Sequence, residues 1–297
     1  MRKLFNQTQE QDIIAQYSTG LSTIKLAEAY NCSPGAINNV LKRNNIQCKS
    51  NKEYRTKYHL DHDFFETIDT EEKAYWLGFL YADGNVRKHG NQSVIQFKTN
   101  DKEVLEKFVK SINCDMPVGK YTRKDGDIYY GVHLTSDKMF EDLCNQGCVP
   151  NKSLILKFPT KIPENLIHHF IRGYFDGDGC VYINNKKWIK TPKTNPTICY
   201  YEKLGIVFNG TNEFLTELNK YFNVGKVSKE NRRKDTNTWY IMSSDQKLVK
   251  EFYNYIYKDA TVWLSRKKEK FENYFKERCS ETIIDQLSDE EISELKE

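Results

Sequence analysis

The sequence has no long hydrophobic run, and this absence excludes whole classes of protein. No stretch approaches the roughly 20 consecutive apolar residues that a membrane span needs. The opening residues, MRKLFNQTQEQ, contain no apolar segment of the kind that secretory signal peptides carry. We therefore expect an intracellular protein with no membrane partner, which would be cytoplasmic if the host is a bacterium or a phage.

Paired cysteines are missing as well. The eight cysteines are scattered singly without any CxxC pair, and the closest two are Cys144 and Cys148. Structural zinc sites and redox-active disulfides usually contain closely spaced pairs of cysteines. We therefore expect all eight cysteines to be reduced and non-catalytic.

Net charge is small, but it is unevenly distributed. The chain carries 45 basic and 41 acidic residues, which gives +4, and its last 17 residues hold seven acids and one lysine. The remainder of the chain therefore carries +10 and contains the basic pairs Lys186, Lys187 and Arg232, Arg233. Such runs are consistent with an anionic partner or with ordinary solvated loops, and charge alone does not separate the two.

What the sequence does contain indicates a folded protein. Mean hydropathy is −0.74, yet 16 Phe, 19 Tyr and 4 Trp are present, and disordered chains lack aromatic residues. A length of 297 residues exceeds one average domain. We expect one substantial core and at least one smaller module.

The first 46 residues predict three short helices, over residues 8–17, 23–30 and 34–44. Apolar residues recur at helical spacing in each, Gly20 separates the first two, and Pro34 suits the first turn of the third. The short connection between the second and third helices is typical of a helix-turn-helix, although a plain three-helix bundle is the alternative. In a helix-turn-helix the third helix enters the major groove, which makes four of its residues candidate DNA contacts: Asn38, Asn39, Lys42 and Arg43.

Residues 47–69 are interpreted as a basic linker. This stretch has little apolar content at its start and carries several cations that could follow a phosphate backbone. Its candidate DNA contacts are Lys49, Lys52 and Arg55.

From Thr70 onward the sequence states the same pattern twice. EEKAYWLGFLYADGNV and IHHFIRGYFDGDGCV both run from an apolar helical pattern into Asp-Gly, and three further pairs of segments match in the same order. Each half predicts helix, two strands, helix, two strands and helix, so the fold class is α+β with two αββαββα halves related by a pseudo-two-fold axis. We place the halves at residues 70–163 and 164–280, followed by an acidic tail at 281–297.

Small residues recur one turn apart within each repeated helix. Such spacing lets two helix backbones approach closely, so the two helices are expected to form the interface between the halves through Gly78, Ala82, Gly173 and Gly177. Asp83 and Asp178 would then end the two helices side by side, where their repulsion and the helix dipoles oppose folding. A divalent cation would relieve that cost, and Mg²⁺ suits a site with few protein oxygens. An ordinary Asp-Gly turn is the alternative, but two in register within a duplication favour a metal site.

These residues resemble the motifs of the LAGLIDADG homing endonucleases in their single-chain, two-motif form. The motifs are WLGFLYADG at 76–84 and IRGYFDGDG at 171–179, and the resemblance covers about residues 70–276. The first motif departs from the family pattern at Tyr81, where an acid is usual.

The resemblance implies a metal-dependent endonuclease with Mg²⁺ as cofactor and Mn²⁺ able to replace it. Asp83 and Asp178, with the carbonyls of Ala82 and Gly177, would hold metal over the scissile phosphates. The two antiparallel sheets would line the DNA as a saddle, and both strands would be cut with a short stagger that leaves 3′ overhangs. The partner would be double-stranded DNA with a long, asymmetric target site, bound by a monomer.

Family members also place one basic residue from each half near the active site. By repeat position these would be Lys152 in VPNKS and Lys267 in LSRKK, unless they are lysines on solvated loops. Thr99 and Asn209, on the strands that face the site, are candidates to orient water.

Two other functions remain open at the level of sequence. The protein could be a regulator that keeps the fold without cutting, although such relatives typically lose the motif acids, which are present here. It could also be a maturase that helps an intron RNA to fold. No segment resembles an intein splicing block, so we expect an intron-encoded or free-standing protein involved in intron homing, in which the added helix-turn-helix raises affinity through effective concentration.

Overall fold

The computed structural model describes residues 4–46, 58–190, 197–230 and 237–284, and of these it describes the backbone alone at 185–190, 197–201 and 277–284. Several predicted DNA contacts lie outside the described residues: Lys49, Lys52, Arg55, Arg232 and Arg233. Lys186 and Lys187 belong to a strand, but their side chains are also outside the described part. The chain divides into two compact units, residues 1–59 and 60–297.

The first unit is built from three helices: α1 (Gln7–Ser18), α2 (Thr23–Ala29) and α3 (Pro34–Arg43). The side chains of Asn6, Ser22 and Ser33 each accept a hydrogen bond from a backbone N–H of the first helical turn. Residue 31 adopts φ of 48° between α2 and α3, a left-handed conformation that asparagine tolerates well. A small core holds the helices together and contains Phe5, Ile13, Tyr17, Leu26, Ala27, Ile37, Val40 and Leu41.

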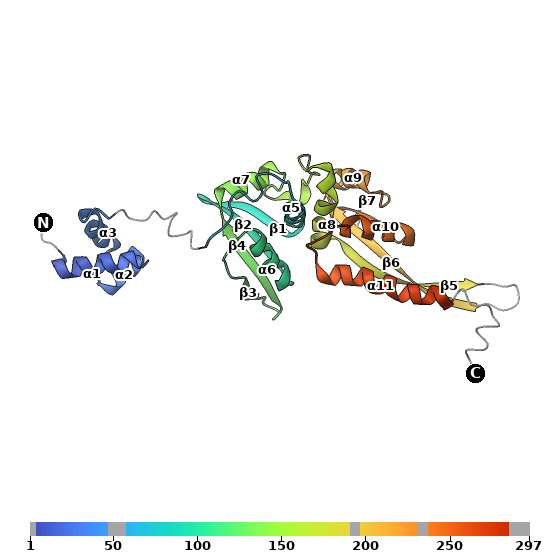
Figure 1. The fold of residues 1–297 in the computed structure, drawn as a ribbon, viewed down its shortest axis with the longest axis horizontal. Helices are drawn as coiled ribbons and strands as arrows, with labels where there is room; N and C mark the ends of the chain where they lie inside the picture. The colour runs from blue at the N-terminus through green and yellow to red at the C-terminus, as the bar shows by residue number, and fades with distance from the viewer. Residues whose placement is uncertain (1–3, 47–57, 191–196, 231–236, 285–297) are drawn as a thin grey trace, which may run out of the picture. The chain divides into compact units, whose positions relative to one another are not determined.

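The second unit repeats one order of elements twice, as the sequence predicts (Figure 1). The first half consists of α5 (Glu71–Asp83), β1 (Gly84–His89), β2 (Gln92–Thr99), α6 (Lys102–Ser111), β3 (Gly119–Thr122), β4 (Ile128–Thr135) and α7 (Asp137–Asn145). The second half consists of α8 (Ile167–Asp178), β5 (Cys180–Lys190), β6 (Thr197–Gly210), α9 (Asn212–Tyr221), β7 (Ser228–Lys229), β8 (Trp239–Ser243) and α10 (Gln246–Tyr257). Two short 3₁₀ turns, η1 (Lys152–Leu154) and η2 (Glu164–Leu166), lie between the halves, and α11 (Ser265–Ile284) follows the second.

Each half contains one antiparallel four-stranded sheet. The strand orders are β1-β2-β4-β3 and β5-β6-β8-β7, so the two sheets have the same topology. The β5–β6 hairpin is longer than the β1–β2 hairpin, because its pairing continues out to Lys190 and Thr197. The αββαββα order predicted for both halves is confirmed.

The two motif helices, α5 and α8, cross at the centre of the unit (Figure 1). A Cβ atom on Gly78 would lie 2.1 Å from the carbonyl oxygen of Phe170, and one on Gly173 would lie 1.9 Å from that of Tyr75. A Cβ on Gly177 would lie 2.3 Å from the Cβ of Ala82. The backbones are therefore in direct contact at the small residues predicted to form the interface.

The boundary that we drew for the linker is wrong at its C-terminal end. Leu60, Phe64, Phe65 and Ile68 are buried in the core of the second unit, and residues from 60 onward belong to that unit. Burial of these apolar side chains outweighs the polar character of the residues between them.

A buried ion pair connects the two halves beside the helix crossing. Arg172 of α8 is fully buried, and its guanidinium donates to Glu71 Oε1 of α5 at 2.7 Å. It also donates to the carbonyl oxygens of Ile256 at 2.7 Å and Val262 at 3.0 Å, and one of its nitrogens lies 2.7 Å from His169 Nδ1. Each of the three guanidinium nitrogens therefore has a hydrogen-bond partner, as burial of a charge requires.

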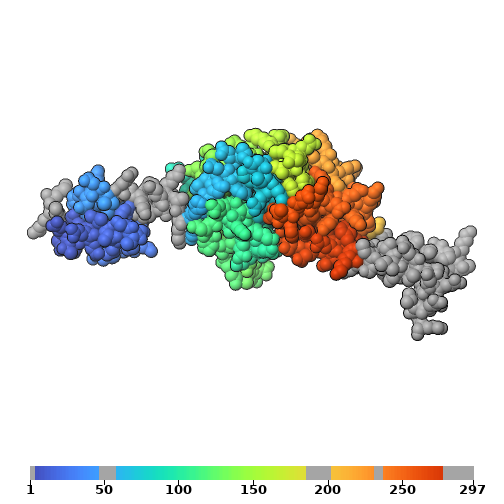
Figure 2. Space-filling model, viewed as in Figure 1, coloured from blue at the N-terminus to red at the C-terminus, as the bar shows by residue number. Residues whose placement is uncertain are grey.

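The contact between the halves continues at the surface, where the residues around the start of α11 (red) lie against those of α6 (green) in Figure 2. Arg266 forms an ion pair with Asp101 at 3.0 Å, and Lys107 donates to the carbonyl oxygen of Trp263 at 3.4 Å. The end of the second half is thereby attached to the first.

Candidate functional site

Asp83 and Asp178 are the last residues of α5 and α8. Each is followed by a glycine with extended backbone, at φ of −71° for Gly84 and −74° for Gly179. These glycines are therefore needed for space and not for a left-handed conformation. A Cβ at either position would lie 2.6 Å from the carbonyl oxygen of the residue four places earlier, which would push the strand away from the helix end.

The two carboxylates influence each other. Both side chains reach solvent, but the dense protein around them raises the pKa of each. For Asp178 the pKa rises to about 6, first through this desolvation and then through repulsion from Asp83, while Lys267 and Lys152 act in the opposite direction. A cation between two carboxylates at adjacent helix ends would reduce their repulsion, which is the arrangement that the sequence predicts.

Lys152 and Lys267 occupy equivalent places, as their repeat positions predict. Lys152 is buried, and its Nζ donates to the carbonyl oxygen of Gly84, the residue after Asp83. Lys267 is buried too, and its Nζ donates to the carbonyl oxygens of Gly179, Phe175 and Asp176, the last at 2.8 Å. Burial lowers the pKa of Lys267 to about 8, against the opposing effect of the neighbouring acids. These lysines are therefore not on solvated loops.

The motif position held by Asp176 and Tyr81 has a structural task in both halves. Asp176 is fully buried and accepts hydrogen bonds from Leu264 N at 2.8 Å and from Tyr75 Oη at 3.0 Å. Tyr81 is also buried, and its Oη donates to the carbonyl oxygen of Gln146 at 2.6 Å. Each side chain thus anchors the segment that leads to its own half's lysine. The departure of the first motif at Tyr81 exchanges an acceptor for a donor and leaves Asp83 in place.

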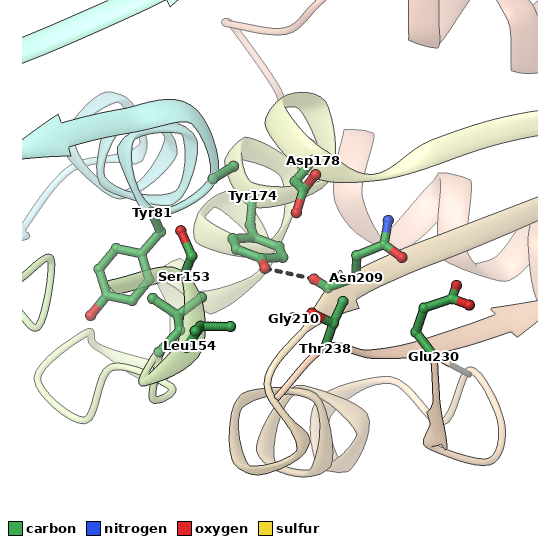
Figure 3. Close-up of a pocket in the computed structure, with 11 residues that line it drawn as sticks. Tyr81, Ser153, Leu154, Tyr174, Asp178, Asn209, Gly210, Glu230 and Thr238 are labelled. Carbon is green, nitrogen blue, oxygen red and sulfur yellow. Dashed lines mark hydrogen bonds between the residues drawn. The ribbon is translucent and has the colours of Figure 1, made fainter. Parts of the chain in front are cut away.

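A cavity of about 500 Å³ opens beside Asp178. Figure 3 shows Asp178 and Asn209 at its rim, with Tyr174 between the two halves and Ser153 and Leu154 opposite. Tyr174 Oη donates to the carbonyl oxygen of Asn209 at 2.7 Å, which fixes the end of β6 against α8. Asn209 therefore lines the same cavity as Asp178, and its role in orienting water stays a prediction.

Thr99 does not occupy the place in the first half that Asn209 occupies in the second. By strand register Lys98 is the equivalent of Asn209, because Phe97 and Phe208 hold matching places on β2 and β6. Side chains alternate between the faces of a strand, so Thr99 lies on the other face. Its Oγ1 accepts from Asp101 N at 3.2 Å.

Sequence reasoning missed the residues on the outer faces of the sheets near the site. In the first half Asn85, Gln96 and His133 form one row across β1, β2 and β4. Arg87 is two residues further along β1 and therefore lies on the same face. Strand alternation in NVRKH and VIQFK could have indicated this face, but the order of the strands in the sheet could not be known.

In the first unit, Asn38, Asn39 and Lys42 are exposed on α3, as predicted for DNA contacts. Arg43 is different, because its guanidinium forms an ion pair with Glu10 of α1 at 2.8 Å. It therefore braces α1 against α3.

The metal-binding capacity of the site rests on the two carboxylates. Among the described residues, no three His, Cys, Asp or Glu side chains gather to form a closed metal site. Mg²⁺ typically takes one or two carboxylates together with water and substrate phosphate oxygens, so Asp83 and Asp178 fit it. The predicted contribution of the Ala82 and Gly177 carbonyls stays a prediction.

No helix in the described part of the chain is long and apolar enough to cross a membrane.

The comparisons with known proteins agree with this geometry. The profile of the LAGLIDADG endonuclease family matches residues 171–277, and that of the LAGLIDADG-like domain matches residues 70–115. An uncharacterized protein of Methanocaldococcus jannaschii is 28% identical over 195 residues, which are 58% of this chain and 68% of that protein. The DNA-directed RNA polymerase subunit Rpo1C of the same organism is 27% identical over 129 residues, 43% of this chain but 14% of that protein.

A solved structure shows the same fold. The LAGLIDADG meganuclease I-AabMI, determined bound to uncleaved DNA, aligns with 75% of this chain and 96% of its own with a TM-score of 0.50 and 13% identity. The two family profiles, one on each half, identify the duplicated unit, and the shared architecture shows its fold. The chain belongs to the LAGLIDADG endonuclease family, in its single-chain form with two motifs.

Proposed function

We propose that this protein is a site-specific homing endonuclease that makes a staggered double-strand break in DNA by metal-dependent hydrolysis of phosphodiester bonds. The observation that carries the proposal is the paired arrangement of Asp83 with Lys152 and of Asp178 with Lys267. One acid and one buried lysine from each half meet at the ends of two crossing helices. Such a duplicated site suits a duplex, which presents two scissile phosphates.

The residues of the chain divide the chemistry between them. Asp83 and Asp178 would bind Mg²⁺, which supplies an activated water and stabilises the leaving oxygen. Lys152 and Lys267 hold the chain just after each acid, and their charges lower the cost of ionising both carboxylates. Asn209 would orient water in the second half, and Lys98 holds the matching strand position in the first. Retention of both motif acids favours cutting over a purely regulatory role.

The decisive experiment compares cleavage by the wild type with that by Asp83→Asn and Asp178→Asn in the presence of Mg²⁺. A plasmid library that contains the gene-flanking or intronless locus would serve as substrate, and linear product would be measured. Each variant should lose at least about 10³-fold in rate, because the metal provides several kcal/mol of transition-state stabilisation.

Glu106→Gln and Glu217→Gln are matched controls, because each neutralises an exposed acid in a surface ion pair, one in each half. Both should cut at the wild-type rate. Equal products from the wild type and from the double variant of Asp83 and Asp178 would refute the mechanism.

We also propose that the first unit adds DNA contacts through α3. Asn38 and Asn39 carry amides that can read base edges, and Lys42 can neutralise a phosphate. All three are exposed on one helix whose apolar residues face the small core.

Binding to the target at several salt concentrations tests this contribution. Lys42→Gln should lower affinity and reduce the salt slope by about one counterion. Lys25→Gln makes the same charge change on the exposed surface of α2 and should have a smaller effect. Identical salt slopes for the two variants would show that α3 does not contact DNA.

A further inference from the structure

The two sheets carry opposite chemistry at the same place. The row Asn85, Gln96, His133 crosses β1, β2 and β4, and by register the matching row in the second half is Cys180, Val207, Met242 across β5, β6 and β8. Three polar residues in one half therefore correspond to three apolar or weakly polar residues in the other.

Both rows lie on the outer faces of their sheets. Directly opposed residues in antiparallel strands point to the same side, and the neighbouring residues on the other side form the core. In the second half these core neighbours are Val181, Ile206 and Ile241, all buried. Cys180 and Met242 are exposed and Val207 is partly buried, so this outer row is available to a ligand.

The next row extends the contrast. In the second half Tyr182 pairs with Gly205, and a Cβ on Gly205 would lie 2.3 Å from the ring of Tyr182. The tyrosine ring therefore lies flat over the strand and enlarges the apolar surface. In the first half the matching pair is Arg87 with Val94, so here the contrast lies at the β1 position alone, which carries an exposed cation.

The position of the rows identifies what would cover them. Asn85 and Cys180 each come two residues after a motif aspartate, so a duplex held with its phosphates at Asp83 and Asp178 continues over both rows. This step rests on the proposed function. An apolar surface in a major groove finds one apolar partner on the base edges, the C5-methyl group of thymine.

We propose that the two halves read half-sites of different base chemistry. The second half contacts thymine methyl groups through Val207, Met242 and Tyr182. The first half recognises its half-site by hydrogen bonds from the amide of Asn85 and the guanidinium of Arg87, while Gln96, whose Nε2 lies 2.7 Å from His133 Nε2, holds that ring in the same row. The amide matches the adenine edge and the guanidinium matches the guanine edge.

The test uses the full chain and a library of random duplexes in EDTA, so that binding is measured without cutting. Retained duplexes define the target, and thymines in one half-site at a time are then replaced by deoxyuridine, which lacks only the methyl group. Burial of one methyl group is worth about 0.8 kcal/mol, so each contacted position should lose about fourfold in affinity. The loss should be confined to one half-site.

Variants assign that half-site to the second half. Met242→Gln and Val207→Thr should abolish the effect of deoxyuridine, and Gln96→Met, the matched change in the first half, should leave it intact. Equal deoxyuridine effects in both half-sites, or effects below twofold in each, would overturn this inference alone. Failure to retain any duplex would overturn the proposed function as well.

Discussion

The two motif helices pack against one another, but they bury different kinds of side chain. Repeat positions match Ala74, Leu77 and Tyr81 of α5 with His169, Arg172 and Asp176 of α8. All six side chains are buried. The first helix therefore has an almost wholly apolar interior face, whereas the second carries a basic residue, an acid and a histidine into the core.

The outer faces of the sheets reverse this contrast. The first half has the polar row that begins at Asn85, and the second has the apolar row that begins at Cys180. The two halves therefore share a backbone fold but differ in where their polar side chains lie. In the first half these side chains are on the outer face of the sheet, and in the second they are on the buried face of the motif helix. The features that both halves share are at the ends of the motif helices, where Asp83 and Asp178 each precede a close-packed glycine.

The largest effect should follow from breaking the ion pair between the buried Arg172 of α8 and Glu71 of α5. Glu71→Gln removes the acid with which the buried Arg172 is paired, and loss of one partner from a buried pair costs about 3–5 kcal/mol of unfolding free energy. Urea denaturation of the full chain would measure this. Lys73→Met breaks the exposed pair with Asp69, at 2.8 Å, and should cost under about 1 kcal/mol. Similar losses for the two variants would contradict the comparison.

A smaller difference should separate Asp176→Asn from Tyr81→Phe. Asp176 accepts at least two hydrogen bonds in the core, whereas Tyr81 makes one to Gln146. Removal of a single buried partner costs about 1–3 kcal/mol, and more where the group is charged. Asp176→Asn should therefore lower the urea midpoint further than Tyr81→Phe. An equal shift for both would mean that the acid and the phenol are interchangeable anchors.

The smallest change at neutral pH concerns His169. Burial and the nearby Arg172 lower its pKa to about 4, and its Nδ1 accepts from that guanidinium only when neutral. An unfolded histidine titrates near pH 6.5, so the unfolded state binds more protons between the two values. Unfolding free energy should therefore fall as pH decreases from about 6.5 to about 4.

His169→Asn keeps an acceptor for Arg172 but does not titrate, so the difference between its stability and that of the wild type should shrink toward low pH. His168, whose pKa is also lowered, remains in both proteins. A wild-type difference that is constant across this window would show that His169 is not the group responsible.

The site could be predicted from sequence to the extent that it depends on the repeat. Asp83, Asp178, Lys152 and Lys267 were found because each has a partner at a matching place in the other half. Thr99 was assigned wrongly, because one residue along a strand reverses the face that a side chain occupies. The similarity between the two repeated sequences did not determine which residues of β2 and β6 hold matching places.

Features that depend on distant parts of the chain were not predictable. Arg172 is stabilised by groups 84 and 101 positions away in sequence, at Ile256 and Glu71. The apolar residues of segment 60–69 could have indicated a buried segment: Leu60, Phe64, Phe65 and Ile68. The cations that precede this segment led us to extend the linker too far. Its docking onto a core formed mainly by later residues could be seen only in the structure.

The Glu71–Arg172 pair also determines which helices can be partners. In a two-fold pairing of two second halves, Arg172 would face the residue that corresponds to Glu71, which by repeat position is Leu166. Such an assembly would bury two Arg172 guanidinium groups without an acidic partner for either. In the pairing of unlike halves, the guanidinium of Arg172 is paired with Glu71. If the halves were expressed as separate chains, they should therefore assemble as a heterodimer. The Glu71–Arg172 ion pair therefore favours the association of unlike halves over the association of two second halves.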